Sequence, residues 1–187
     1  GLKSTFDEDG NLIVDAEDFV EVTGTSTSTN IQKYFNETSV WGTYRLVNNI
    51  DLTELISSDS SLVLPSTNKS FSGNFYGNGF RISGISINAD DPGLSFGLFS
   101  SIESRSNVSP IVTNLDMTLN SLDAGARVMV GGLAGYIKDA IIINIDITFN
   151  ENALLSGLNY VGGLTGFAYG DNIIKNINVT NPNVTAY

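Results

Sequence analysis

The stretch IVTNLDMTLN at residues 111–120 recurs as IIINIDITFN at residues 141–150 and as IIKNINVTN at residues 173–181. A weaker copy, RISGISIN, lies at residues 81–88. Aligning the copies makes positions 84, 114, 144 and 176 equivalent, so the copies are 30, 30 and 32 residues apart. Self-similarity at a fixed period of this length is typical of a solenoid, in which each unit stacks on the one before it. We therefore predict a stacked repeat fold.

Apolar and polar residues alternate within each copy. Leu115 and Met117 point to one side of an extended chain, whereas Asp116 points to the other. A period of two predicts β-strands rather than helices. Because like positions of stacked strands lie about 4.8 Å apart, the inward residues should form continuous apolar columns that no single unit could bury alone. The inward set comprises Leu115, Met117, Leu119, Ile145, Ile147, Phe149, Ile177 and Val179.

Two polar positions of the repeat are also brought into register by stacking. Asn114, Asn144 and Asn176 align, and because Asn tolerates the left-handed backbone conformation, we predict an amide ladder at a turn. Asp116 aligns with Asp146, and like charges facing each other destabilise a sheet by roughly 0.2–1 kcal/mol. Solvation, protonation of one carboxyl group or a shared cation would relieve this repulsion.

A glycine-rich phrase repeats out of step with the first. It reads SFGLF at residues 95–99, VGGLAGY at residues 130–136 and VGGLTGF at residues 161–167. Glycine supplies φ values that other residues avoid, and within a strand pattern it also marks close backbone approach. We expect these phrases to form corners that join two or three short strands in each unit.

The two later glycine phrases resemble the GLUG motif of bacterial surface proteins. YRLVNNIDL at residues 44–52 and FSGNFYGNGFRI at residues 71–82 are similar to the segments that open such domains, and the resemblance covers residues 40–180. It implies a right-handed parallel β-helix in a secreted or surface-attached bacterial protein. Relatives occur in adhesins, in S-layer-like proteins and in the non-catalytic parts of secreted proteases of the IgA-cleaving type. The family name carries no enzymatic activity, and none is implied here.

The predicted domain organisation is an all-β solenoid behind an N-terminal cap. Residues 41–187 form the parallel β-helix, and we expect further windings to follow them in the full protein. Residues 1–40 lack the repeat and would cover the open end of the stack. Within this cap, Asp9-Gly10 predicts a hairpin turn, and the spacing of Ile31, Tyr34 and Phe35 predicts a short helix.

Composition excludes several classes of function. With 9 Lys and Arg against 20 Asp and Glu, the net charge of −11 argues against nucleic-acid binding, which needs clustered basic residues. No run of 18 apolar residues occurs, so we expect no membrane insertion. His and Cys are absent, which removes Ser-His and Cys-His nucleophile systems and His-ligated zinc. Carboxylates, Arg, Lys and Tyr remain as functional groups.

Carboxylates provide two candidate chemistries. A carbohydrate-active enzyme would need a pair of them as acid and base, and either Asp90-Asp91 or Asp116 with Asp146 could supply it. Asp90-Asp91 reads more simply as a turn, and the Asp116 and Asp146 pair would lie on a flat, wet face with no arginine in matching register. Calcium prefers oxygen ligands, so Asp116 and Asp146 are the candidate metal ligands. A second calcium candidate, at residues 7–11, reads more simply as the hairpin turn.

Aromatic residues provide a third candidate, a glycan site. Aromatic rings serve at wet recognition sites, and Tyr76 and Asn78 in the Gly-rich segment at residues 76–79 are the residues we expect to be exposed and to contact a sugar. Tyr136 and Phe167 occupy equivalent repeat positions, so we expect them to pack on each other.

These observations favour a non-catalytic structural or adhesive module of an extracellular or cell-surface protein, forming part of a stalk, lattice or adhesin. Two alternatives remain open: a carbohydrate-binding or carbohydrate-active β-helix, and an accessory domain of a secreted protease. The expected partners are other domains or subunits of the same surface protein and host or surface glycans. We expect no cofactor, apart from the calcium considered above.

Overall fold

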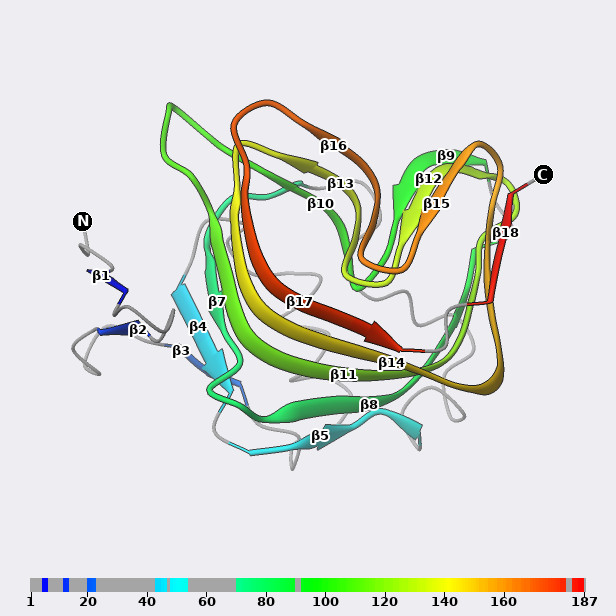
Figure 1. The fold of residues 1–187 in the computed structure, drawn as a ribbon, viewed down its shortest axis with the longest axis horizontal. Helices are drawn as coiled ribbons and strands as arrows, with labels where there is room; N and C mark the ends of the chain where they lie inside the picture. Colours follow the sequence, from blue (N-terminus) through cyan, green and yellow to red (C-terminus); the bar gives the residue numbers. More distant parts are fainter. Residues whose placement is uncertain are drawn as a thin grey trace.

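The computed structural model describes residues 5–6, 12–13, 20–22, 43–46, 48–53, 70–89, 92–180 and 183–186 of the 187-residue chain. The strands from residue 20 onward pair in parallel, each with the equivalent strand of the preceding or following winding. Figure 1 shows these windings as nested ribbons that follow the same path, from cyan through green and yellow to red. The predicted all-β parallel β-helix is therefore confirmed.

Three parallel sheets form the walls of the solenoid. The broad, curved sheet contains β3 (Val20–Val22), β4 (Thr43–Leu46), β5 (Ile50–Asp51), β7 (Asn74–Tyr76), β8 (Arg81–Asn88), β11 (Ile111–Asp123), β14 (Ile141–Gly157), β17 (Ile173–Thr180) and β18 (Val184–Ala186). The second contains β6 (Ser70–Phe71), β10 (Phe99–Glu103), β13 (Ala134–Lys138) and β16 (Thr165–Tyr169). The third contains β9 (Gly93–Phe96), β12 (Arg127–Gly131) and β15 (Tyr160–Gly162).

The second and third sheets fold inward toward each other and meet at the glycine corners. In Figure 1 they form a V-shaped notch in the outline of the coil, opposite the broad sheet. Each corner lies within one glycine phrase. The corners join β9 to β10, β12 to β13 and β15 to β16. The cross-section of the solenoid therefore has one convex side and one indented side.

The predicted inward columns form the core. Leu115 pairs with Ile145, which pairs with Ile177, so the three lie in one file as the repeat requires. Leu115 and Ile145 are buried, and Ile177 is partly buried against the same cluster. The strict alternation of the sequence thus sorts apolar side chains into the interior and places Asp116 and Thr118 on the outer face.

The weak copy at residues 81–88 does not align as predicted. Thr113 pairs with Tyr76 and Asp116 pairs with Arg81, so the segment after Tyr76 contains two more residues than its counterpart in the next winding. The extra residues form a turn in which the amide groups of Gly77 and Gly79 donate to the carbonyl groups of Thr113 and Asn114. Beyond this turn the register is shifted, and Ile85 pairs with Leu119 rather than with Leu115.

The corner glycines serve close approach rather than unusual φ values. Among the described residues, the glycines with a left-handed φ are Gly79, Gly84 and Gly170, none of which belongs to a glycine phrase. At Gly132, an added Cβ atom would collide with the carbonyl oxygen of Gly163 in the next winding. The prediction that the corner glycines adopt unusual φ values is therefore wrong, and the prediction that they allow close backbone approach is confirmed.

The predicted hairpin of the cap is present in its two strands. β1 (Thr5–Phe6) pairs antiparallel with β2 (Leu12–Ile13), with Thr5 opposite Ile13. The turn itself and the helix expected near Ile31 lie outside the described residues.

No helix in the described part of the chain is long and apolar enough to span a membrane.

Candidate functional site: a notch lined by serines and aromatic rings

The predicted pair Asp116 and Asp146 lies in register on neighbouring strands, but the repulsion between the two is relieved by protein groups. The Nε and Nη2 atoms of Arg81 donate to Oδ2 of Asp116 at 3.0 and 2.8 Å. Asn178 donates from Nδ2 to Oδ1 of Asp146 at 2.9 Å. The expectation that no arginine lies in matching register is wrong, because the shifted register of β8 places Arg81 beside Asp116.

Candidate metal ligands are scattered in the described part of the chain. There, no group of three or more Asp, Glu, His or Cys side chains lies close enough together to hold a metal ion. The carboxylates of Asp116 and Asp146 already accept hydrogen bonds from Arg81 and Asn178. The other carboxylate candidates, at residues 7–11 and 90–91, lie outside the described residues.

The exposure predicted for Tyr76 is wrong. The residue ends β7, where it pairs with Arg45 on one side and with Thr113 on the other, and its side chain is only 1% exposed. Burial between two windings removes this ring from any contact with a glycan. Asn78 is exposed as expected. It has a φ of 53°, and its Nδ2 atom donates to the carbonyl oxygen of Leu46 at 3.0 Å.

The predicted asparagine ladder is present at an outer turn of the broad sheet. Asn144 donates from Nδ2 to Oδ1 of Asn114 at 3.0 Å, and Asn176 donates to Asn144 at the same distance. The three residues have φ values of 53°, 57° and 56°, in the left-handed region that Asn tolerates. These amides are structural, since each one ties a winding to its neighbour.

The notch between the second and third sheets presents two columns of outward side chains. Parallel pairing places Ser70, Ser101, Tyr136 and Phe167 in one column, on β6, β10, β13 and β16. The facing column contains Ser95, Met129 and Tyr160, on β9, β12 and β15. Along the notch, serines in the earlier windings therefore give way to large side chains in the later ones.

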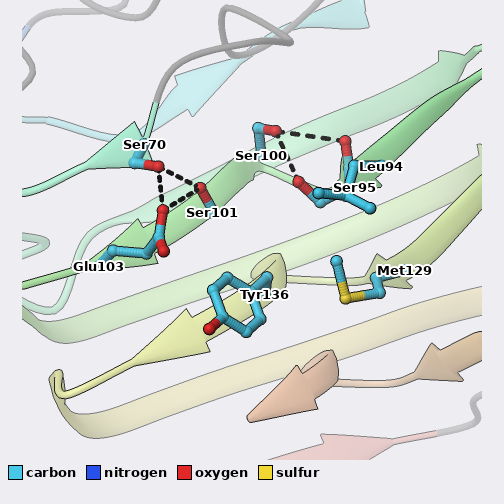
Figure 2. Close-up of a pocket in the computed structure, with 8 residues that line it drawn as sticks. All are labelled: Ser70, Leu94, Ser95, Ser100, Ser101, Glu103, Met129 and Tyr136. Carbon is cyan, nitrogen blue, oxygen red and sulfur yellow. Dashed lines mark hydrogen bonds between the residues drawn. The ribbon is translucent and has the colours of Figure 1, made fainter. Parts of the chain in front are cut away.

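A pocket of about 390 Å³ lies where the serines give way to the large side chains. Figure 2 shows its lining, which consists of Ser70, Leu94, Ser95, Ser100, Ser101, Glu103, Met129 and Tyr136. Ser100 occupies the position that Gly135 fills one winding later, and its hydroxyl lies 3.0 Å from the hydroxyl of Ser95 on the facing wall. This contact joins the two walls at the deep end of the notch.

Glu103 is the one carboxylate among the described lining residues, and serines hold it in place. Ser70 donates its hydroxyl to Oε2 of Glu103, and Ser101 donates to Ser70 at 2.8 Å. Ser101 also lies within 3.4 Å of the same carboxylate oxygen. These bonds orient the carboxylate toward the pocket side of β10, as Figure 2 shows.

The aromatic residues beyond the pocket form the predicted ladder. Tyr136 and Phe167 are stacked, with ring centroids 5.9 Å apart and an angle of 21° between the ring planes. Tyr160 approaches Phe167 edge-on from the facing wall at 5.4 Å. Lys138 lies over the ring of Tyr169, with Nζ 5.7 Å from the centroid. Phe167, Tyr160 and Tyr169 are 39%, 49% and 58% exposed, so the rim of the notch is rich in accessible rings.

The hydroxyl group of Tyr136 stays protonated well beyond neutral pH. Burial raises the pKa of Tyr136 above its usual value of 10.0, and the negative charges of Glu103 and Asp139 and the neighbouring Tyr169 raise it further. Because the neutral phenol can donate and accept a hydrogen bond, this group adds a donor to a pocket whose carboxylate only accepts.

The sequence contains a signal for this pocket that the prediction of Tyr76 and Asn78 does not use. Aligning SFGLFSS with VGGLAGY sets Ser101 against Tyr136, so an aromatic position of the repeat is occupied by serine. The two walls of the notch, however, belong to strands on either side of a corner, so the alternation within one strand does not show which side faces the other strand. Comparisons with protein-family models, with curated proteins and with solved structures returned no match to this chain.

Proposed function

We propose that this chain is a non-catalytic structural and adhesive module of a bacterial extracellular or cell-surface protein, serving as a stalk, lattice or adhesin segment. The observation that carries the proposal is the continuity of packing along the stack. A single apolar cluster runs from Tyr44 to Leu155, and Ile177 and Val179 of the last winding pack against it. A module built in this way transmits force and holds surface groups at fixed positions.

Ladders of side chains outside the core support the same role. The Asn114, Asn144 and Asn176 amides bond one winding to the next, and Tyr136 and Phe167 stack on the opposite side. Parallel backbone pairing adds hydrogen bonds along β11 and β14 over most of their length. Bending or stretching the rod would require many of these bonds to break together, because each winding contacts its neighbours all around the coil.

The chemistry of the carboxylates favours a non-catalytic module over a glycosidase. A general acid of that class needs a pKa raised by an apolar setting, and retaining and inverting enzymes both use two carboxylates across the scissile bond. Asp116 is bonded to a cationic guanidinium group, and Asp146 is exposed and accepts from an amide. In the pocket, Glu103 is the one carboxylate among the described lining residues. The resemblance of the glycine phrases to the GLUG motif agrees with this reading.

The proposal is tested by two measurements on the same protein. In single-molecule force spectroscopy, the solenoid should resist extension and then unfold in steps that correspond to whole windings. In a turnover assay with neutral and acidic polysaccharides, no new reducing ends or unsaturated products should form. Extension at low force with no resolved steps would contradict the mechanical role, and sustained product formation would contradict the non-catalytic role.

A further inference from the structure

We propose that the pocket between β9, β10, β12 and β13 binds one uncharged sugar ring of a glycan chain, with the rest of the chain lying along the notch. The inference rests on the adhesive function proposed above and names the class of its ligand. It assigns the contact to Tyr136, Glu103 and the surrounding serines instead of to the loop that contains Asn78.

The shape of the pocket follows from a change of side chain within one column. In the later windings the column carries the stacked rings of Tyr136 and Phe167. In the two earlier windings the same column carries Ser101 and Ser70, which are far smaller. The resulting space of about 390 Å³ is bordered by Tyr136 on one side and by the serines on the other. A ring placed there would continue the ladder by one position.

The lining matches the two kinds of surface that a sugar presents. Tyr136 and Met129 provide an apolar side for the C–H groups of a pyranose ring, and Leu94 adds apolar surface beside Ser95. The opposite side carries hydroxyl groups and the carboxylate of Glu103. Aromatic and apolar surface with a few well-placed polar groups is the usual composition of a small-molecule site. A purely apolar ligand, such as an aromatic side chain of a protein, would instead leave these polar groups facing a surface that cannot bond to them.

Hydrogen-bonding capacity remains for a ligand with several hydroxyl groups. Ser70 donates to Oε2 of Glu103 and Ser101 lies near the same oxygen, whereas no described residue donates to Oε1. The geometry points to Oε1 as the acceptor for a sugar hydroxyl. Serine hydroxyls that already donate still have lone pairs to accept with, and the protonated phenol of Tyr136 can donate.

Charge selects a neutral ligand over an acidic one. The chain carries a net charge of −11, and the pocket itself contains a carboxylate. Lys138, which is in register with Glu103, holds its ammonium group over the ring of Tyr169. Arg127 is buried and donates to the carbonyl oxygen of Ser95. A uronate or a sulfated sugar would therefore place its negative charge near Glu103, while these two described cations are engaged elsewhere.

The test is isothermal titration calorimetry of the full chain with uncharged hexasaccharides of glucose, xylose, mannose and N-acetylglucosamine, and with hexagalacturonate as the acidic comparison. We expect at least one neutral oligosaccharide to bind saturably and hexagalacturonate not to bind. Tyr136→Ala removes the ring beside the site. Glu103→Gln keeps the volume of the side chain, and Ser101→Phe fills the space with a ring. Asp146→Asn, the corresponding change at an exposed carboxylate on the broad sheet, is the matched control for Glu103→Gln.

We expect the affinity for the bound oligosaccharide to fall at least about tenfold in Glu103→Gln, as for the loss of one hydrogen bond to a charged group. Tyr136→Ala should reduce it by a similar factor and Ser101→Phe should abolish it, while Asp146→Asn binds as the unmodified chain does. Failure of every neutral oligosaccharide to bind at millimolar concentration, or binding that survives Glu103→Gln and Ser101→Phe in folded variants, overturns the site. The mechanical role would survive either result. Cleavage of the ligand would overturn the non-catalytic role and leave the site in place.

Discussion

Substitution of the corner glycine Gly132 by alanine should destabilise the solenoid strongly. The new methyl group would collide with the carbonyl oxygen of Gly163, and it would also meet Ile147 Cγ2 and Phe149 Cζ at 3.4 Å. A backbone carbonyl in the next winding cannot rotate away as a flexible side chain would. The two windings must therefore separate at the corner.

The size of the effect follows from the contacts that separation would disturb. Overpacking of this kind costs about 1–3 kcal/mol. The amide of Gly132 donates to Gly163 at 3.0 Å, and Leu98 donates to the carbonyl of Gly132 at 3.2 Å. Weakening these two hydrogen bonds adds about 1 kcal/mol each at most. We therefore expect a loss of about 1–5 kcal/mol, which for a chain of this length lowers the melting temperature by about 2–20 °C.

Gly79→Ala is the matched control because Gly79 has a left-handed φ and no close neighbour, whereas Gly132 has a close neighbour and no left-handed φ. Gly79 has a φ of 76°, and no atom lies within 4 Å of the position of an added Cβ. The left-handed conformation costs alanine roughly 1–2 kcal/mol, and the lower entropy of the unfolded chain offsets about 0.4–1 kcal/mol of the loss in both variants. Urea unfolding followed by circular dichroism should thus show a clearly larger loss for Gly132→Ala. An equal or larger loss for Gly79→Ala would refute the argument that close approach explains the corner glycines.

Three further predictions concern the ladders. Asn144→Ala should cost about 2–4 kcal/mol in urea unfolding, because it removes two amide hydrogen bonds and leaves alanine at a φ of 57°; a loss below about 1 kcal/mol would contradict the structural role of that column. Arg81→Gln should remove the guanidinium group that pairs with Asp116 next to Asp146. Stability should then fall slightly at low salt and recover with added salt, and a loss that does not depend on salt would count against this view. Because the pKa of Tyr136 is raised in the folded chain, the phenol ionises at lower pH in the unfolded chain than in the folded chain. The stability that the protonated phenol contributes is therefore fully present below about pH 10. It is lost as the pH rises through the folded-state pKa. Ultraviolet titration of Tyr136→Phe should lack one tyrosine that ionises above the usual pKa in the unmodified chain. If the tyrosine that disappears is instead one that ionises near the usual pKa, the assignment to Tyr136 is wrong.

Three of the expectations that failed trace to the segment around Tyr76: the alignment of residues 81–88, the absence of an arginine beside Asp116 and the exposure of Tyr76. An alignment of the repeat through Gly84 differs from the structure, in which two extra residues at the turn after Tyr76 shift the register of β8. That shift is the reason why Arg81 reaches Asp116 and relieves a repulsion that the sequence left open. Tyr76 was misplaced for a related reason, since the strand β7 extends to it and the loop begins only at the next residue.

Spacing and alternation in the sequence determine the stacking of windings, the apolar column of Leu115, Ile145 and Ile177, and the asparagine ladder. Each of these depends on residues one repeat apart, and parallel pairing carries equal positions into contact. The notch is decided only by the tertiary structure. Its walls, with Ser95 and Met129 on one side and Ser101, Glu103 and Tyr136 on the other, face each other because the glycine corners let the backbone fold inward. The direction of that fold is set by packing across the whole winding, and no local pattern of residues encodes it.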